Sequence, residues 1–264
     1  MCQLHPAIVR AIILHKENRI MGAVITKESL IPPSRTDANG KLSYTGCLEM
    51  FMDIAAEHTE ILGIGISQLA PKGMFWITAK TKAHFYRRPR ITERVTLSSW
   101  PESLSSSRCI RDYRLSKGDE VLAEGRTQWA IVNVTDGSLV NTQNLYPEDL
   151  NVKDESFALS DFERIDCRFD SEPFARYTVQ STDIDLGRHM NNVAYLRALQ
   201  STFTVKEWLY ADITELELQY RKPCYEGDVL EFRKMDTGDA VYIKGSIGED
   251  TCVCMIIRYA GLSS

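Results

Sequence analysis

The sequence lacks several features that would place it in common functional classes. No apolar run reaches the ~18 residues that a membrane-spanning helix needs. The seven cysteines are odd in number and scattered, and no Cys-x-x-Cys pair occurs, so we expect reduced thiols rather than a zinc site or a disulfide framework. The Gly63-x-Gly65 pair is predicted at the end of a helix and not after a strand. It therefore indicates no phosphate-binding loop, and no cofactor is implied.

The charge balance is ordinary for a folded protein and argues against nucleic-acid binding. Hydrophobic residues make up 44% of the chain, charged residues make up 25%, and the formal net charge is −5. This acidic balance is the opposite of what a nucleic-acid partner requires. A short apolar segment, residues 7–14, has charges on both sides and no clear cleavage site after it. We interpret it as part of the folded body rather than as a signal peptide, and we predict a cytoplasmic protein.

Two segments have the periodicity of amphipathic helices. The first spans residues 45–65 and the second spans residues 191–209. Apolar residues recur in each at steps of three and four, which makes one apolar stripe. Gly63 is a stop signal for the first helix, and Asn191 or Asn192 can cap the start of the second. The stripes consist of Leu48, Phe51, Met52, Ala55, Thr59 and Leu62 in the first segment and of Tyr195, Leu196, Leu199 and Phe203 in the second.

Alternation of apolar and polar residues predicts strands after each helix. It is clearest in residues 75–86, 215–220 and 253–259. Cys252 and Cys254 are two residues apart, which predicts that both lie on the same face of a strand. Each half therefore has one long helix followed by an antiparallel sheet that wraps it, and the predicted fold class is α+β.

The predicted halves repeat at an offset of roughly 145 residues, which indicates a domain duplication. The stretch 141–171 is mixed and polar, and we predict that it is a linker. It would join an N-terminal domain, residues 1–140, to a C-terminal domain, residues 172–264.

The segment from Thr182 to Leu196 gathers polar side chains just ahead of the second helix. Hydrolysis of a thioester needs a base or nucleophile, an imidazole that moves protons and donors for the developing oxyanion. The free N–H groups of a helix N-terminus supply such donors. Taken singly, each residue has a structural explanation as a turn, cap or packing residue, but their convergence favours a catalytic site. Their spacing matches no standard metal site. The residues are Asp183, Asp185, His189, Asn191 and Asn192.

This segment resembles the signature of acyl-(acyl carrier protein) thioesterases. The resemblance continues in residues 50–65, 73–102 and 215–224 and extends from about Ala23 to Tyr259. It implies two tandem hotdog domains, hydrolysis of fatty acyl thioesters and acyl carrier protein as the partner. It also implies catalysis by Asp185 and His189, with Asn191 and Asn192 supporting the oxyanion at the helix N-terminus. The matching residues are Asp185, His189, Asn191, Asn192 and Tyr195.

Two positions depart from the family pattern. An Asn of the family motif falls at Gly187, and a Glu of the plant members falls at Pro223, although the following Cys is kept as Cys224. Two side chains credited with catalysis in the family are therefore absent here. Cys224 and Glu226 are possible accessory residues. Cys224 is more simply explained as a plain strand residue, and Glu217, the other nearby carboxylate, as an outward-facing one.

The first half contains a degenerate copy of the loop. Thr36, Asp37 and Asn39 echo the second half, but no His follows in the loop, and His58 lies inside the predicted helix. The resemblance implies that this half forms the acyl-chain pocket, although ordinary core packing explains each candidate lining residue equally simply. Those candidates are Phe51, Met52, Ile54 and Trp76.

A basic cluster of Arg87, Arg88 and Arg90 is a candidate docking site for an acidic carrier protein, with a solvated strand end as the alternative. Other interpretations also stay open. The substrate can be acyl-coenzyme A instead, or the chain can be a non-catalytic protein that binds acyl thioesters. Asp185 can orient His189 or attack as a nucleophile. Because the resemblance puts both domains in one chain, a monomer can be competent, and a homodimer is left open.

Overall fold

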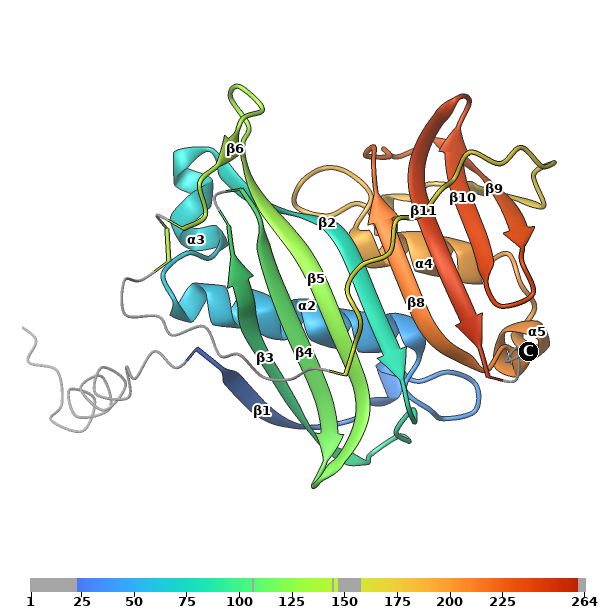
Figure 1. Cartoon of the computed structure of the whole chain (residues 1–264), viewed down its shortest axis with the longest axis horizontal. Coiled ribbons are helices and arrows are strands. Elements are labelled where there is room, and N and C mark those ends of the chain that lie inside the picture. The colour runs from blue at the N-terminus through green and yellow to red at the C-terminus, as the bar shows by residue number, and fades with distance from the viewer. Residues whose placement is uncertain (1–22, 106, 144, 147–157, 261–264) are drawn as a thin grey trace, which may run out of the picture.

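The fold is built on one large antiparallel sheet with its long helices on one face (Figure 1). The computed structural model describes residues 23–105, 107–143, 145–146 and 158–260. The apolar segment 7–14 lies outside the described residues, as does much of the first part of the predicted linker.

Among the described residues, ten strands follow one another across the sheet in the order β1-β3-β4-β5-β2-β8-β11-β10-β9-β7, and β6 pairs with β5. Every pairing is antiparallel. The strands are β1 (Ile25–Leu30), β2 (Met74–Phe85), β3 (Arg94–Leu104), β4 (Cys109–Lys117), β5 (Glu120–Asn133), β6 (Leu139–Val140), β7 (Ala175–Thr178), β8 (Ile213–Tyr220), β9 (Val229–Asp236), β10 (Val241–Ile247) and β11 (Asp250–Tyr259).

The first predicted helix is confirmed as α2 (Tyr44–Ile61). The side chain of Ser43 caps it by accepting a hydrogen bond from the N–H of Gly46, 3.0 Å away. Gly63 follows in the left-handed conformation with φ of 76°, which glycine adopts without steric cost. A short helix α3 (Ile66–Leu69) comes next, and 3₁₀ turns occupy Pro33–Arg35, Ala70–Lys72 and Ser181–Asp183.

The prediction of one continuous helix over residues 191–209 is wrong. The segment is divided into α4 (Asn192–Gln200) and α5 (Val205–Tyr210). Thr204 and Glu207 form a capping box, in which each side chain satisfies the other residue's backbone N–H, so a new helix starts there. The inner faces of α2 and α4 share one apolar core with the sheet.

The two halves of the chain meet where β2 pairs with β8. The register runs from Lys80 opposite Gln219 to His84 opposite Glu215. A register shift between Thr78 and Lys80 interrupts the predicted alternation of β2. Alternation predicts that Ile77 and Ala83 lie on the same buried face of the strand. The bulge between them puts the two residues on opposite faces, so Ile77 is 37% exposed while Ala83 is fully buried.

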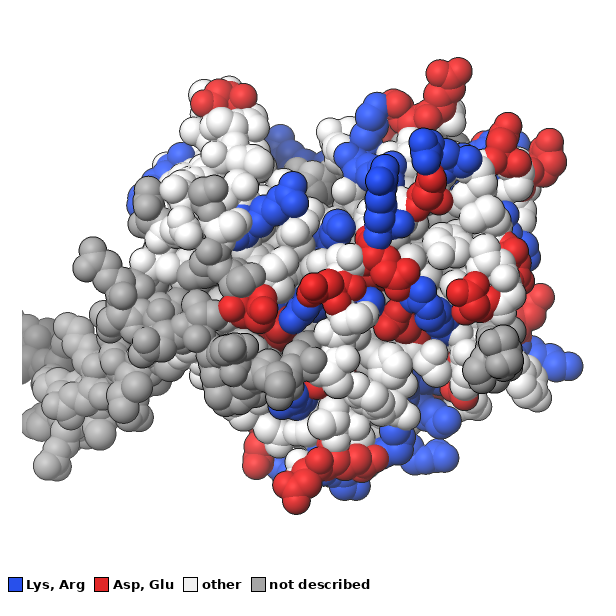
Figure 2. Space-filling model, in the orientation of Figure 1, with Lys and Arg blue, Asp and Glu red and all other residues white. Residues whose placement is uncertain are grey.

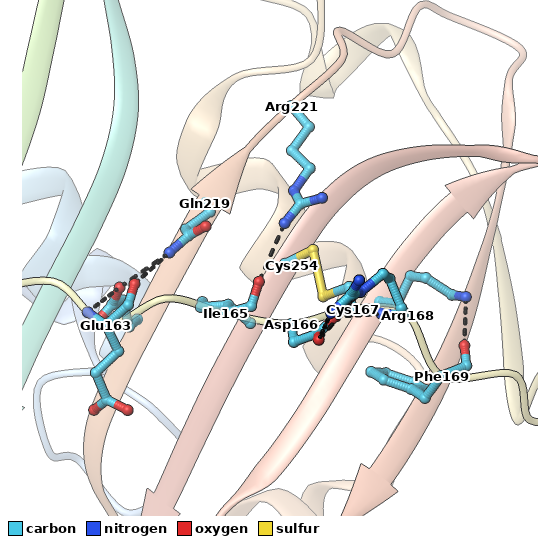
Figure 3. The surroundings of a disulfide bond; sticks show 11 residues. Glu163, Ile165, Asp166, Cys167, Arg168, Phe169, Gln219, Arg221 and Cys254 are labelled. Carbon is cyan, nitrogen blue, oxygen red and sulfur yellow. Dashed lines mark hydrogen bonds and ion pairs between the residues drawn. A yellow bond between two sulfur atoms is a disulfide. The ribbon is translucent and has the colours of Figure 1, made fainter.

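The described part of the linker, from residue 158 onward, crosses the sheet on the face opposite the helices (Figures 1 and 3). The side chains of Gln219 and Arg221 donate hydrogen bonds to the carbonyls of Glu163 and Ile165 at 2.8 and 3.2 Å. Cys167 is joined to Cys254 of β11 by a disulfide (Figure 3). The expectation that all thiols are reduced is therefore not met, because residues 87 apart in sequence give no spacing signal.

The linker also covers a buried charge cluster. Lys82 is fully buried, and its ammonium lies 3.6 Å from carboxylate oxygens of both Glu215 and Glu217. The linker hydroxyl of Ser160 accepts a hydrogen bond from the same ammonium at 2.8 Å. Figure 2 shows this face, where basic and acidic side chains interleave rather than separate into patches.

The prediction that Cys252 and Cys254 share a face is wrong. Gly245 pairs with Val253 and Ser246 pairs with Thr251, so Cys252 is the extra residue of a bulge. Cys252 packs into the core under the helices, whereas Cys254 packs under the linker. Among the described residues, no helix has the length and hydropathy to span a membrane.

Candidate active site

The loop before α4 is a tight hairpin that brings Asp185 and His189 together. Ile184 and Met190 form an isolated bridge, and the N–H of Asp185 donates to the carbonyl of His189 at 3.1 Å. The N–H of Arg188 closes the turn on the carbonyl of Asp185 at 2.9 Å, with Arg188 in the left-handed conformation at φ 61°. The backbone therefore fixes the two side chains on neighbouring positions of one turn.

The imidazole and the carboxylate face each other and remain open to solvent. His189 Nδ1 lies 4.0 Å from Asp185 Oδ1, and the side chains are 36% and 32% exposed. The ring also lies near a carbonyl, with Nδ1 3.4 Å from the oxygen of Met190. A proton on Nδ1 would leave Nε2 as the basic nitrogen. The expected proximity of the two residues is confirmed.

Gly187 leaves space beside both groups. A Cβ built at Gly187 would lie 2.9 Å from His189 Nε2 and 3.0 Å from Asp185 Oδ1. Any side chain there would have to displace the ring or the carboxylate. The Gly187 N–H donates to Asp185 Oδ1 at 2.7 Å, so the backbone at this position holds the carboxylate while the missing side chain keeps its surroundings open.

The N-terminus of α4 follows the loop directly. The side chain of Asn191 caps it, accepting from the N–H of Val193 at 2.9 Å, as the sequence predicts. No described group accepts a hydrogen bond from the N–H of Asn192, the first residue of the helix. That N–H is a donor at the positive end of the helix dipole, and it follows His189 closely in the sequence.

Asp183 has a structural role. It is 2% exposed, and its Oδ2 accepts hydrogen bonds from the Tyr177 hydroxyl at 2.8 Å and from the N–H of Gln180 at 2.9 Å. Burial, with the adjacent carboxylate of Asp183, raises the pKa of Tyr177 to about 12, so the phenol stays a donor. Of the two acidic residues in the loop, only Asp185 faces His189.

Tyr195 and Cys224 lie behind the loop, in the core. Both are at most 2% exposed, and the Tyr195 hydroxyl approaches the carbonyl of Lys222 at 3.4 Å. A hydrogen bond from Cys252 lowers the pKa of the Cys224 thiol. The backbone of Cys224 anchors the loop, because its carbonyl accepts from the N–H of Met190 at 2.8 Å. Its full burial argues against an accessory catalytic role, but the expectation of a strand residue is wrong, because Cys224 lies in the loop between β8 and β9.

The candidate carboxylates near Pro223 differ in position. Glu226 is exposed in the turn before Gly227, and Pro223 is also exposed. Glu217 is fully buried on the linker side of the sheet, where its carboxylate accepts from the N–H of Glu163 at 3.1 Å. Glu217 points away from the helices, as expected, but it is buried rather than exposed, because the linker covers it. This position excludes it from the catalytic role considered for a carboxylate near Pro223.

The first-half loop has the same backbone but a different environment. The N–H of Asp37 donates to the carbonyl of Lys41 at 2.8 Å, so Lys41 takes the position of His189. The Asp37 carboxylate accepts from the N–H groups of Asn39 and Lys41 and from the guanidinium of Arg88. Its side chain is only 5% exposed. Thr36 bridges to Leu42 at the base of the turn.

A cavity of about 150 Å³ lies beside the second half of α2. Met52 and Trp76 line it, as expected, whereas Phe51 and Ile54 are buried core residues outside its lining. Phe51 stacks on Tyr113 with ring centroids 4.9 Å apart. Sequence reasoning missed Cys109, Arg111 and Trp129 because strands distant in sequence supply them, whereas the further lining residues of α2 and α3 lie close to the expected ones. The lining is Met52, Ala55, Ala56, Thr59, Glu60, Ile66, Trp76, Cys109, Arg111, Trp129 and Tyr146.

The three arginines proposed for docking have unequal exposure. Arg87 is bound to Glu93 and Glu120, and Arg88 is bound to Asp37 and lies over the ring of Tyr44. Arg90 is exposed, and no carboxylate in the described part of the chain lies within ion-pair distance of it. Arg90 is therefore the member best placed to meet a partner. Among the described residues, no three His, Cys, Asp or Glu side chains are placed together to hold a metal ion.

Comparison with family models places the chain. The model of the acyl-ACP thioesterase N-terminal domain matches residues 22–143, and the model of the acyl-ACP thioesterase C-terminal domain matches residues 168–251. The two matches cover most of the sequence. The chain belongs to the acyl-ACP thioesterase family.

Similar plant proteins include the oleoyl-acyl carrier protein thioesterase of Coriandrum sativum, 23% identical over 237 residues, which are 80% of this chain and 60% of the relative. The palmitoyl-acyl carrier protein thioesterase of Gossypium hirsutum is 19% identical over 88% of this chain and 59% of its own length. Both are chloroplastic. The chain thus spans about three fifths of the length of these relatives.

Solved structures share the fold. An acyl-ACP thioesterase from Bacteroides thetaiotaomicron aligns with a TM-score of 0.79 at 20% identity, covering 90% of this chain and 98% of that one. The 12:0-ACP thioesterase from Umbellularia californica aligns with a TM-score of 0.71 at 16% identity, covering 90% and 97%. At such identities the likeness is one of fold alone.

Proposed function

We propose that the chain hydrolyses fatty acyl-ACP thioesters to a free fatty acid and the carrier thiol. The observation that carries this proposal is the placement of His189 and Asp185, 4.0 Å apart and open to solvent, directly before the N-terminus of α4. Family membership and the names of the relatives support acyl-ACP as the substrate. The chain-length preference of the relatives is not carried over.

We also propose that the sheet consists of two tandem hotdog domains, 1–140 and 172–264, joined by the linker 141–171. The equivalent hydrogen bonds of the loops at Asp37 and Asp185 support a duplication. So does the element order, in which α2 and α4 each precede a run of antiparallel strands. A cytoplasmic location and a homodimer stay predictions.

In the proposed reaction, His189 Nε2 takes a proton from water, and the resulting hydroxide attacks the thioester carbonyl carbon. The N–H of Asn192 donates to the oxyanion that forms. The C–S bond then breaks, and His189 returns its proton to the leaving thiolate. The space over Gly187, which borders both His189 Nε2 and Asp185 Oδ1, is where the attacking water would contact both groups.

Asp185 has two possible roles in this scheme. As an orienting group, it holds the imidazole and stabilises the imidazolium that forms during proton transfer. As a nucleophile, its carboxylate would attack the carbonyl carbon, and the C–S bond would break as the anhydride forms, with His189 supplying a proton to the leaving thiolate. Water would then cleave the anhydride. Single turnover in ¹⁸O-labelled water tests the second role, because only that route can leave label in the enzyme's carboxylate, when water attacks the aspartyl carbon of the anhydride.

The substrate carrier is tested by comparing the same acyl chain on acyl carrier protein and on coenzyme A. Release of free thiol is measured for both with purified protein. We expect the higher kcat/KM with the carrier protein. A preference for coenzyme A would support the acyl-CoA thioesterase alternative, and saturable binding without thiol release would support a non-catalytic acyl-thioester-binding protein.

A further inference from the structure

The cavity beside α2 contains a charged side chain that a plain hydrocarbon chain does not explain. Most of its lining is apolar or aromatic, including Met52, Trp76 and Trp129, as an acyl chain requires. Arg111 of β4 is also part of the lining. Its side chain is only 2% exposed. A buried guanidinium among apolar groups is costly unless it is paired.

The position of Arg111 in its strand shows that it faces the helix. Residues at two-residue spacing in β4 point to the same side, and here that row is Cys109, Arg111, Tyr113 and Leu115. The other three residues of the row are buried hydrophobic or aromatic residues. Arg111 thus occupies a position where the sheet otherwise buries apolar side chains against α2.

The protein partners of Arg111 are neutral. Its Nη1 lies 3.0 Å from His58 Nδ1 and 3.1 Å from the hydroxyl of Ser99. A guanidinium only donates hydrogen bonds, so His58 Nδ1 accepts and its ring carries no charge. Nη2 of Arg111 is buried, and no described group accepts a hydrogen bond from it. No carboxylate of the described residues lies within ion-pair distance of this guanidinium either.

The other polar groups of the lining offer Arg111 no negative charge. The Tyr146 hydroxyl lies 3.0 Å from the thiol of Cys109 and also interacts with the Arg111 guanidinium, which opposes the pKa rise of the phenol. Burial still raises the pKa of both Tyr146 and Cys109, which keeps them neutral. The Glu60 carboxylate accepts from the N–H of Ser67 at 3.0 Å and from the Ser67 hydroxyl. The described part of the chain therefore supplies no anion to Arg111.

We propose that the preferred substrate has an acyl chain whose far end, away from the thioester, carries a carboxylate that accepts hydrogen bonds from Arg111. This inference rests on the proposed function. A carboxylate would accept from Nη2 and neutralise the buried charge. A methyl-ended chain would bury the guanidinium further and leave it unpaired. Sites built to hydrogen-bond a substrate group reject the analogue that lacks it.

The test uses carrier-bound acyl chains of equal length that end in a methyl, a hydroxyl or a carboxylate group, prepared at several lengths. With wild-type protein we expect kcat/KM for the carboxylate-ended chain to exceed that for the methyl-ended chain by roughly tenfold to a hundredfold at the best length. The hydroxyl-ended chain should fall between them. A methyl-ended preference at every length would overturn the proposal.

Arg111→Met is expected to remove the preference, and Arg111→Lys to keep part of it. Arg114→Met is the matched control, because Arg114 lies on the other face of the same strand and pairs with Glu124. It should leave the ratio of rates unchanged. An unchanged ratio in folded Arg111→Met would also overturn the proposal. If Arg111→Met does not fold, the comparison of methyl-ended and carboxylate-ended substrates with wild-type protein still tests the proposal.

A binding measurement separates this inference from the proposed hydrolysis. Non-hydrolysable amide analogues of the methyl-ended and carboxylate-ended substrates are titrated into wild-type protein by calorimetry. If no substrate releases thiol, the proposed function fails, but tighter binding of the carboxylate-ended analogue still supports the role of Arg111. Equal or weaker binding of that analogue contradicts it.

Discussion

The loop before α2 and the loop before α4 have the same backbone and different chemistry. Each closes on an Asp whose N–H donates to the carbonyl four residues on, at 2.8 Å for Asp37 and 3.1 Å for Asp185. Each has a left-handed residue at the same point, with φ of 67° at Gly40 and 61° at Arg188. Each ends in a capping side chain, Ser43 or Asn191.

The difference lies in what surrounds the carboxylate. Asp37 is 5% exposed and bound to Arg88, whereas Asp185 is 32% exposed and faces His189. The positions equivalent to Arg88 and Lys41 are Pro223 and His189, since the carbonyls of Pro89 and Cys224 accept the corresponding loop N–H groups. The same loop backbone can thus serve stability in one half of the chain and be available for reaction in the other.

The largest expected effect is on His189. His189→Ala removes the proposed proton-transfer group, and we expect turnover to fall by about 10²–10⁴-fold while the protein stays folded. Lys41→Ala changes the equivalent position of the first loop and serves as the control. It should leave turnover unchanged. Thiol release under saturating substrate measures both, and a near-normal rate in His189→Ala would end the role assigned to it.

The two aspartates should respond in opposite ways. Asp185→Asn is expected to reduce kcat at least tenfold, because the imidazole loses its anionic neighbour or the reaction loses its nucleophile, with little change in the free energy of unfolding. Asp37→Asn should instead lower the free energy of unfolding by about 2 kcal/mol, because Arg88 loses a charged partner. Urea unfolding and thiol release together measure the contrast. Equal effects of the two variants on kcat would contradict the different roles proposed for Asp185 and Asp37.

Gly187 tests whether the open space beside the ring matters. Gly187→Ala places a Cβ 2.9 Å from His189 Nε2 unless the ring moves. We expect kcat to fall by roughly tenfold, because small displacements of catalytic groups are costly. Asn39→Ala at the equivalent position of the first loop is the control. If Gly187→Ala and Asn39→Ala both keep the full rate, the space over Gly187 is not used.

The smallest expected effect concerns carrier docking. Arg90→Glu reverses an exposed charge and should raise KM for acyl-ACP by a few fold at low salt, with kcat unchanged. The effect should shrink as salt is added, since exposed charges are screened. The KM for acyl-coenzyme A should not change in the same variant, because coenzyme A has no protein surface that could contact residue 90. An unchanged KM for acyl-ACP would remove Arg90 from the docking site.

Periodicity predicted the elements of the fold that depend on local sequence. The helix α2, the cap Asn191 and the proximity of Asp185 to His189 are set by residues close in sequence, and these predictions are confirmed. The bulges in β2 and β11 were missed because one extra residue depends on how neighbouring strands pair. The break before α5 had a readable signal in Thr204 and Glu207 that the apolar stripe obscured.

The features that depend on distant segments were not predictable in the same way. The disulfide between Cys167 and Cys254 forms because the linker crosses the outer face of the sheet. The cavity with Arg111 requires β4, β5 and α2 to be placed together. A charged residue in an inward-facing row of β4 was the available signal, but it has meaning only once the strand's direction is known.

The most direct test of the account is a crystal structure of the protein with a non-hydrolysable acyl amide analogue on the carrier's pantetheine group. We expect the amide carbonyl oxygen to lie within hydrogen-bond distance of the Asn192 N–H, with the carbonyl carbon beside His189. An analogue whose carbonyl lies at the first loop, near Asp37 and Lys41, or whose binding leaves His189 pointing away from it, would contradict the account.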